Sequence, residues 1–287
     1  MINVVLLLLS IVLGTSKNVL SKLCPAGSVY RLNAIAFFVA SCVGFLFLIG
    51  TGIRITAWIL LMALAYALFT FVAQVAYIKA VAIGDFAISS LMYSCGFVLP
   101  TLLGAFLFRE SVSPWQIVGL TVLILSFVLA NLRQKTEKST GMWLFLSLSA
   151  MLSSGMVGLI QKLFRASEDG GELDSLLTVS FLMIAVVSGV LVLLQKRKEG
   201  IPTEKKDKKL ALLGLSGLLG CVIFLQNKTN LFLSGALSSM LFFPLVNGGT
   251  VVASALTDRV AFGKRIDARK GVSIVLGILG IVLIVIK

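Results

Sequence analysis

The chain consists almost entirely of apolar blocks of about 20 residues, the length that an α-helix needs to cross a bilayer core about 30 Å thick. Hydrophobic residues make up 58% of its 287 residues and charged residues only 13%. Soluble domains carry about 25% charged residues. The sequence therefore predicts an all-α, multi-pass membrane protein with no room for a sizeable soluble domain.

Short breakers rich in glycine, proline and charge separate ten such blocks. The first block lacks a basic segment before it and a small-residue cleavage site after it, so we interpret it as a retained span and not as a signal peptide. We expect ten transmembrane helices over residues 1–23, 30–50, 55–82, 86–108, 114–132, 141–163, 174–195, 209–232, 236–258 and 271–286.

The order of short motifs repeats once along the chain. In the first half, the stretch 87–90 (Ala-Ile-Ser-Ser) precedes Pro100 and then Phe-Arg-Glu at 108–110. In the second half, the similar stretch 236–239 (Ala-Leu-Ser-Ser) precedes Pro244 and then Phe-Gly-Lys at 262–264. The chain is therefore expected to contain two related units.

We expect a five-helix unit over residues 1–133, a basic linker over 134–140 and a second five-helix unit over 141–287. An odd number of spans per unit turns the second unit upside down in the membrane. Such inverted repeats hold a substrate site near the membrane midplane, at their interface.

Basic residues concentrate in three loops that this topology places on one side of the membrane, within residues 133–138, 196–209 and 264–270. Cytoplasmic loops of membrane proteins carry the excess of Lys and Arg. We therefore expect this side to be cytoplasmic, in a protein of the cell membrane whose two termini both face the outside of the cell. Topology and attraction to anionic lipid explain the net charge of +13, so we expect no nucleic-acid partner.

Polar residues inside the spans recur on common helix faces, at spacings of three and four residues. Such groups are costly in hydrocarbon and nearly always face protein or water. We predict that ten of them line a substrate-binding cavity: Lys17, Asn18, Tyr66, Gln74, Tyr77, Tyr93, Gln161, Gln226, Asn230 and Asn247. The span glycines are expected to bring helices close together instead: Gly96, Gly104, Gly214, Gly217, Gly220, Gly248, Gly249, Gly277 and Gly280.

Lys17 interrupts the first apolar block and has two interpretations. Its aliphatic stem can carry the ammonium group to the headgroups, or it lines the cavity on a face shared with Ser10 and Ser21. The sequence leaves both open, and it favours the headgroup interpretation for Lys228. No carboxylate lies near the middle of a predicted span, so we expect a neutral, zwitterionic or anionic substrate rather than a cation.

The residue types argue against catalysis. The chain contains no histidine, which excludes His-dependent triads, His-ligated zinc and imidazole proton relays. Its four cysteines have no metal-ligand spacing. We therefore expect no enzyme activity, no cofactor and no metal site.

The chain resembles the EamA-type family of the drug/metabolite transporter superfamily. The residues that carry this resemblance are 14–22, Pro100 with 108–119, 243–249 and 262–267. It implies a transporter of small organic solutes. Two features depart from the family: Lys264 stands where the family typically has glutamate, and the loop charge places the termini outside rather than in the cytoplasm.

These observations predict a transporter that moves a small organic metabolite by alternating access through a midplane cavity between its two repeats. The alternative is a flippase, or an accessory subunit, for a lipid-linked substrate, with a cavity that opens sideways to lipid. The expected partners are the small-molecule substrate and the lipid bilayer. The sequence leaves open whether the protein forms a homodimer.

Overall fold

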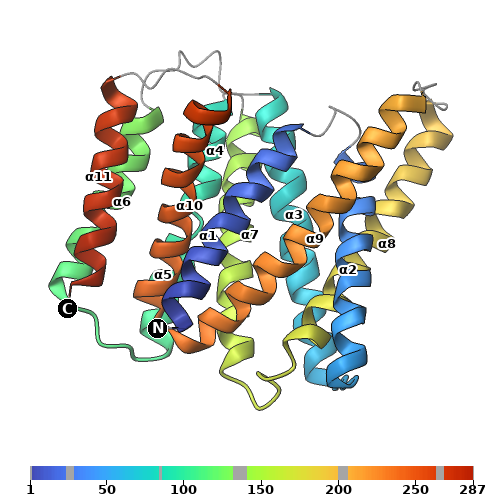
Figure 1. Ribbon diagram of the computed structural model, residues 1–287, viewed down its shortest axis with the longest axis horizontal. Helices are drawn as coiled ribbons and strands as arrows, with labels where there is room; N and C mark the ends of the chain where they lie inside the picture. Colours follow the sequence, from blue (N-terminus) through green and yellow to red (C-terminus); the bar gives the residue numbers. More distant parts are fainter. Residues whose placement is uncertain are drawn as a thin grey trace.

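A computed structural model describes residues 2–23, 29–83, 86–131, 141–199, 206–262 and 268–286, and the regular secondary structure in these ranges is helical. The helices lie alongside one another as a bundle (Figure 1). They are α1 (Ile2–Leu23), α2 (Val29–Thr51), α3 (Ala57–Ile83), α4 (Phe86–Cys95), α5 (Val98–Leu107), α6 (Pro114–Asn131), α7 (Gly141–Arg165), α8 (Leu173–Glu199), α9 (Lys206–Ala236), α10 (Ser239–Phe262) and α11 (Ala268–Val285).

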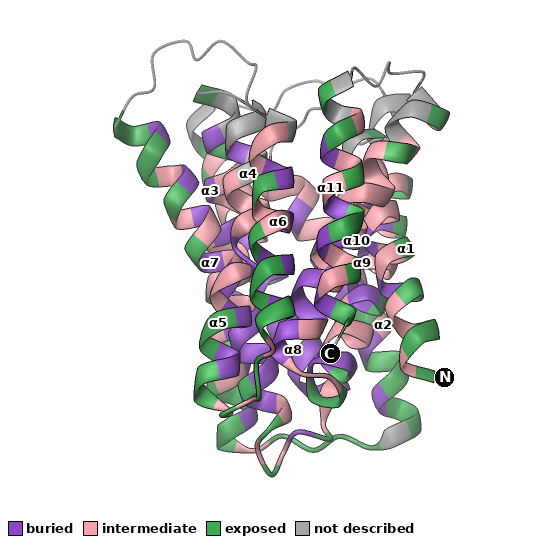
Figure 2. Cartoon of the chain, turned by 90° about the vertical axis from the view of Figure 1, so that its left-hand side faces the viewer, coloured by how far each residue is buried: buried purple, intermediate pink, exposed green. Residues whose placement is uncertain are grey.

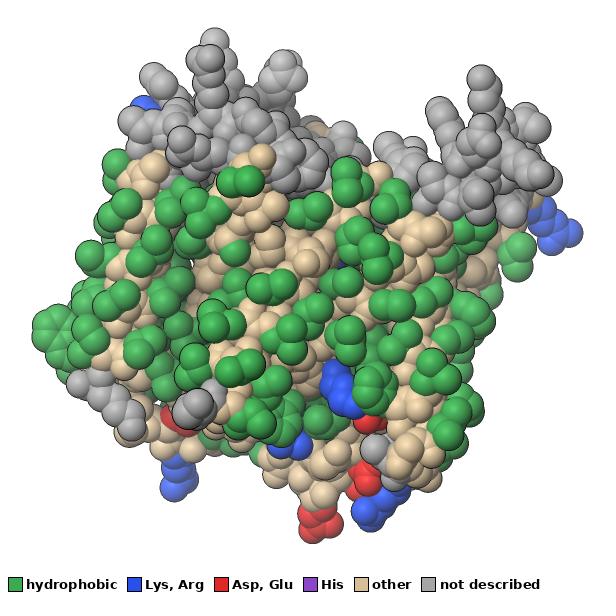
Figure 3. Space-filling model, viewed as in Figure 1, with side chains coloured by type: hydrophobic (Ala, Val, Ile, Leu, Met, Phe, Trp, Pro, Cys, Tyr) green, Lys and Arg blue, Asp and Glu red, His purple; other side chains and the backbone are tan. Residues whose placement is uncertain are grey.

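Seven of the described helices are long and apolar enough to cross a membrane: α1, α2, α3, α7, α8, α9 and α10. Three shorter apolar stretches cover 92–107, 114–129 and 271–285. Hydrophobic side chains cover the middle of the outer face in Figure 3, and charged side chains lie mostly toward its lower edge. Phe106, for example, is 80% exposed. The structure is therefore consistent with a multi-pass membrane protein.

The helix expected over residues 86–108 is interrupted. α4 ends at Cys95 and α5 begins at Val98. Pro100 lacks a backbone N–H, and in a continuous helix its ring would clash with the carbonyl of Gly96. Tight turns replace the helix here, with the Gly96 N–H bonded to the Tyr93 carbonyl (3.2 Å) and the Leu99 N–H to the Gly96 carbonyl (3.2 Å). The prediction of one unbroken helix is wrong at this point, whereas α10 continues through Pro244.

Both chain termini lie at one end of the bundle, beside the connections 108–113, 166–172 and 237–238 (Figure 1). We call this the termini-side end. The connections 132–140, 200–205 and 263–267, which contain many of the basic residues, lie outside the described residues.

Two hydrophobic cores hold the bundle together, and Figure 2 shows buried residues gathered between the helices. The first core joins α2, α3, α7, α8 and α9, and the second joins α5, α6, α10 and α11 with Leu233 at the end of α9. Phe164, Phe181 and Phe224 are fully buried in the first core, while Phe127 and Phe243 lie in the second. Each core draws helices from both halves of the sequence, so the halves interleave.

Glycines bring helices close together at most of the positions where the sequence predicts it. A Cβ on Gly220 would collide with the backbone of α2, at the Ala36 carbonyl. The prediction is confirmed at Gly96, Gly104, Gly220, Gly248, Gly249, Gly277 and Gly280. It is wrong at Gly214 and Gly217, where an added Cβ would meet nothing within 4 Å.

The contact between α6 and α11 provides a test of this packing. A Cβ on Gly119 would lie 2.7 Å from the Gly280 carbonyl oxygen, a backbone atom that cannot move away alone. We expect Gly119→Ala to lower the free energy of unfolding by about 1–3 kcal/mol, the usual cost of overpacking. Thermal unfolding in detergent, followed by circular dichroism, measures this change.

Gly189→Ala is the matched control, because a Cβ at Gly189 meets nothing within 4 Å. It should leave stability unchanged or raise it slightly, since alanine is the better helix former. Equal effects of the two substitutions would contradict close packing at Gly119.

Candidate functional site

Tyr66 is the centre of a hydrogen-bond chain that joins three helices. Its side chain is 1% exposed on α3. The hydroxyl donates to Asn227 Oδ1 on α9 (2.6 Å) and accepts from Gln161 Nε2 on α7 (3.1 Å). Asn227 Nδ2 in turn donates to the Ile223 carbonyl (2.8 Å). The phenol thus has both a donor and an acceptor partner, which its burial requires.

A second set of polar contacts follows one face of α1, at residues four apart. Ser10 Oγ donates to Asn230 Oδ1 on α9, and Asn18 Nδ2 donates to Ser254 Oγ on α10 at 3.1 Å. Gly14 lies between them. A Cβ at this glycine would be 2.8 Å from Gln226 Nε2, so the glycine leaves the space that the glutamine amide needs.

Gln226 carries a buried acceptor that no described residue satisfies. Its side chain is 7% exposed, and its Oε1 has no hydrogen-bond partner among the described atoms. Thr70 Oγ1, on α3 one turn beyond Tyr66, is likewise buried and unpartnered in the described part of the chain. An unmade hydrogen bond of this kind costs about 1–3 kcal/mol. A ligand that donates to Gln226 would remove that cost.

The other predicted site residues lie on α1, α3, α4 and α10. Tyr77 on α3 and Tyr93 on α4 pack their rings together, with centroids 4.8 Å apart. Gln74 lies one turn before Tyr77 and is half-buried, as is Lys17, one turn beyond Gly14. Asn247 donates instead to a carbonyl of its own helix, that of Phe243 (2.8 Å).

The structure thus joins Asn18, Tyr66, Gln161 and Asn230 to partners in the opposite half of the chain. It also pairs Tyr77 with Tyr93. Asn227, the residue that extends the Tyr66 chain, was not among the predicted site residues. It lies three residues before Asn230, and this spacing, which places two residues on one helix face, is the sequence signal that could have indicated it.

One ion pair that the sequence did not reveal lies between α8 and α9. Lys228 Nζ is 2.9 Å from Asp174 Oδ2 and 3.7 Å from the centre of the Phe47 ring. Lys228 was interpreted as reaching the headgroups, but the structure gives its ammonium group a carboxylate and an aromatic partner within the protein. The two charges are 54 residues apart in the chain, so sequence spacing gave no indication of the pair.

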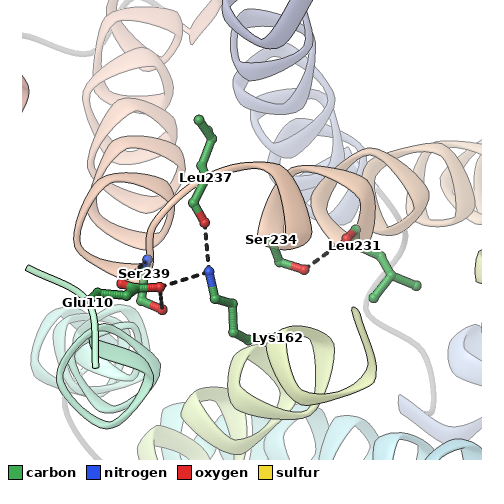
Figure 4. A network of polar contacts seen from close by, with 6 residues as sticks. All are labelled: Glu110, Lys162, Leu231, Ser234, Leu237 and Ser239. Carbon is green, nitrogen blue, oxygen red and sulfur yellow. Dashed lines mark hydrogen bonds and ion pairs between the residues drawn. The ribbon is translucent and has the colours of Figure 1, made fainter. Parts of the chain in front are cut away.

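A second such pair, between Glu110 and Lys162, lies at the start of α10 (Figure 4). Glu110 accepts hydrogen bonds from the Ser239 backbone N–H (2.7 Å) and from Ser239 Oγ (3.2 Å). Lys162 Nζ lies 3.0 Å from Glu110 Oε1 and donates to the Leu237 carbonyl at 2.7 Å. A carboxylate at a helix N-terminus is favourable, because it meets free N–H groups and the positive end of the helix dipole. We call these four residues the Glu110 cluster.

Comparisons with known proteins support the fold alone. No protein-family model and no curated protein matches the chain. Among solved structures, one described as "Crystal structure of protein" matches with a TM-score of 0.77. The match covers 99% of this chain and 98% of that one at 15% sequence identity. In the described residues, no group of three or more His, Cys, Asp or Glu side chains is placed to hold a metal ion.

The hydrogen bonds of the Tyr66 hydroxyl can be tested by a substitution that removes this hydroxyl. Tyr66→Phe removes the hydroxyl and leaves the Gln161 and Asn227 amides without their shared partner. We expect the free energy of unfolding to fall by about 1–3 kcal/mol, the cost of leaving buried polar groups unsatisfied. Thermal unfolding in detergent measures it.

Tyr30→Phe makes the same chemical change on α2, where the ring of Tyr30 stacks on Phe71 with centroids 6.4 Å apart. This control should have a smaller effect, because the aromatic packing is retained. A Tyr66→Phe protein as stable as the parent would show that the hydrogen-bond chain contributes nothing.

Proposed function

We propose that the protein is a membrane transporter that moves a small organic metabolite by alternating access between two inverted five-helix repeats. The observation that carries the proposal is a seam of polar contacts between the two halves of an otherwise apolar bundle. This polar seam consists of Ser10, Asn18, Tyr66, Gln161, Gln226, Asn227, Asn230 and Ser254. Polar groups inside membrane helices are costly and mark substrate pathways.

The pairing of helices supports the repeat. α2 and α8, each second in its half, pack on each other, as do α6 and α11, each the last in its half. The contact of α3 with α7 has its counterpart in the contact of α9 with α1. A two-fold axis in the membrane plane relates helices in this way. In this scheme α4 and α5 together form one interrupted span that corresponds to α10, which brings the number of spans to ten.

The charges near the seam favour a neutral, zwitterionic or anionic substrate. Glu110 and Asp174 are already paired with lysines, so neither carboxylate is available to a cation. The polar seam itself offers amide and hydroxyl groups, which suit a substrate of this kind. The resemblance to EamA-type transporters adds independent support from the sequence, and the proposed location is the cell membrane.

Ligand-induced thermal stabilisation tests the function, because a ligand that binds only the folded state raises the melting temperature. The probes are amino acids, organic acids, sugar phosphates and nucleobases, added singly to the detergent-purified protein. We expect one class to stabilise the parent, and Gln226→Leu or Gln74→Leu to abolish both this shift and uptake into proteoliposomes. Both variants should remain folded.

Thr121→Val is the control for these variants, because the Thr121 hydroxyl donates within its own helix, to the Ile117 carbonyl (2.9 Å), and Thr121 is exposed. It should keep the full ligand response. Full transport by both glutamine variants would contradict the site. Stabilisation by a polyprenyl phosphate alone would instead favour a flippase or an accessory subunit for a lipid-linked substrate.

Orientation in the membrane has its own test. In a protein whose native cysteines are replaced by serine, a membrane-impermeant maleimide should label Ser111→Cys on intact cells, because Ser111 is exposed at the termini-side end. Ser139→Cys, in the basic linker, should be labelled only after the cells are permeabilised, as the positive-inside rule requires. The reverse pattern would place the termini in the cytoplasm.

A further inference from the structure

The Glu110 cluster connects the two hydrophobic cores at the termini-side end. Glu110 follows α5, and Ser239 begins α10, both helices of the second core. Lys162 lies on α7 between Ile160 and Phe164, which belong to the first core. The ion pair therefore reaches from one core to the other, close to the turn through which α9 continues into α10.

The backbone fixes the carboxylate side of this contact. α5 ends at Leu107, and Arg109 adopts a left-handed conformation with φ of 49°. The Glu110 N–H bonds to the Ala105 carbonyl (2.9 Å) and the Arg109 N–H to the Phe106 carbonyl (3.2 Å). These two bonds form a Schellman motif, which ends a helix and sets the direction of the following chain. The motif directs Glu110 toward α10.

Close packing holds the carboxylate and α10 as one unit. Gly104 on α5 contacts Ser239 so closely that a Cβ at the glycine would overlap the Ser239 hydroxyl. Ser239 is fully buried and donates to Glu110 through both its N–H and its hydroxyl. A movement between the cores would therefore carry Glu110 and Ser239 together.

Lys162 is the flexible side of the contact. A lysine presents a point charge on a flexible four-carbon stem, in contrast to the rigid fork of an arginine. Its ammonium group meets Glu110, the Leu237 carbonyl and, at 5.6 Å, the centre of the Phe108 ring. Phe108 and Glu110 lie in the segment directly after α5, and Leu237 lies in the α9–α10 turn. These partners are therefore all outside α7.

We propose that Glu110 and Lys162 form a latch that holds the termini-side end closed, an inference that rests on the proposed transporter function. The side chains of Lys162 and Glu110 are only 10% and 13% exposed, and a buried charge is tolerated only with its partner. In the closed state each charge therefore depends on the other. Separation of α7 from α5 and α10 admits water, which solvates each charge and makes the open state accessible.

Distance measurement between two spin labels tests the latch without any knowledge of the substrate. The labels are placed on Ser111→Cys, beyond α5, and Ala166→Cys, after α7, because both positions are exposed at the termini-side end. The native cysteines are first replaced by serine. In the parent we expect one dominant short distance. Glu110→Gln and Lys162→Met should each raise a longer-distance population by at least about tenfold, the effect of losing one charge-assisted hydrogen bond.

Two further variants make the test specific. Lys162→Gln removes the charge but keeps an N–H donor on a slightly shorter side chain, so it tests the ion pair even if the methionine variant does not fold. The double variant Glu110→Gln/Lys162→Gln should open no further than either single variant, because both changes break the same contact. Glu168→Gln, an exposed carboxylate at the same end, is the control and should leave the distances unchanged.

The outcomes separate the latch from the transporter proposal. Opening in the latch variants but not in Glu168→Gln supports the latch, even if no transported metabolite is found. Unchanged distances in folded Glu110→Gln and Lys162→Gln proteins overturn it. A protein that transports a metabolite while its distances remain unchanged keeps the transporter function and loses the latch.

Discussion

The cost of an unpaired polar group in apolar surroundings is the constraint on which this structure depends. Helices satisfy backbone groups internally, so an apolar chain of this kind folds into helices. The side chains need separate partners. Tyr66 finds them in Gln161 and Asn227, and Ser10 in Asn230. Because these partners come from opposite halves of the chain, satisfying the polar groups also joins the halves.

The halves therefore do not fold as two separate bodies. Each hydrophobic core uses helices from both, and the polar seam and the Glu110 cluster add directional contacts between them. Hydrogen bonds and ion pairs add contacts of defined geometry to the close apolar packing of the helices. The cores also meet through apolar contacts, because α9 contributes Leu231 to the first core and Leu233 to the second.

Sequence reasoning located the helices well, because a block of about 20 apolar residues is a strong signal. It missed the interruption between α4 and α5, where Gly96 and Pro100 act together on the backbone. For the site, the polar faces on α1 and α3 drew attention to Asn18 and Tyr66, which the structure joins by hydrogen bonds to other helices. The polar faces did not indicate the hydrogen-bond partners of these two residues. Residue spacing shows which side chains share a face of one helix, but it carries no information about the neighbouring helices.

The sequence by itself determined the all-helical class, the approximate helix positions and the polar residues that must avoid lipid, because each follows from the local spacing of residue types. Only the tertiary structure decided that Lys162 meets Glu110, that Lys228 meets Asp174 and that Gln226 keeps a buried oxygen without a partner among the described residues. The physical reason is that these contacts join helices far apart in the chain. Their partners are set by how closely whole helices pack, which depends on glycines such as Gly14 and Gly104.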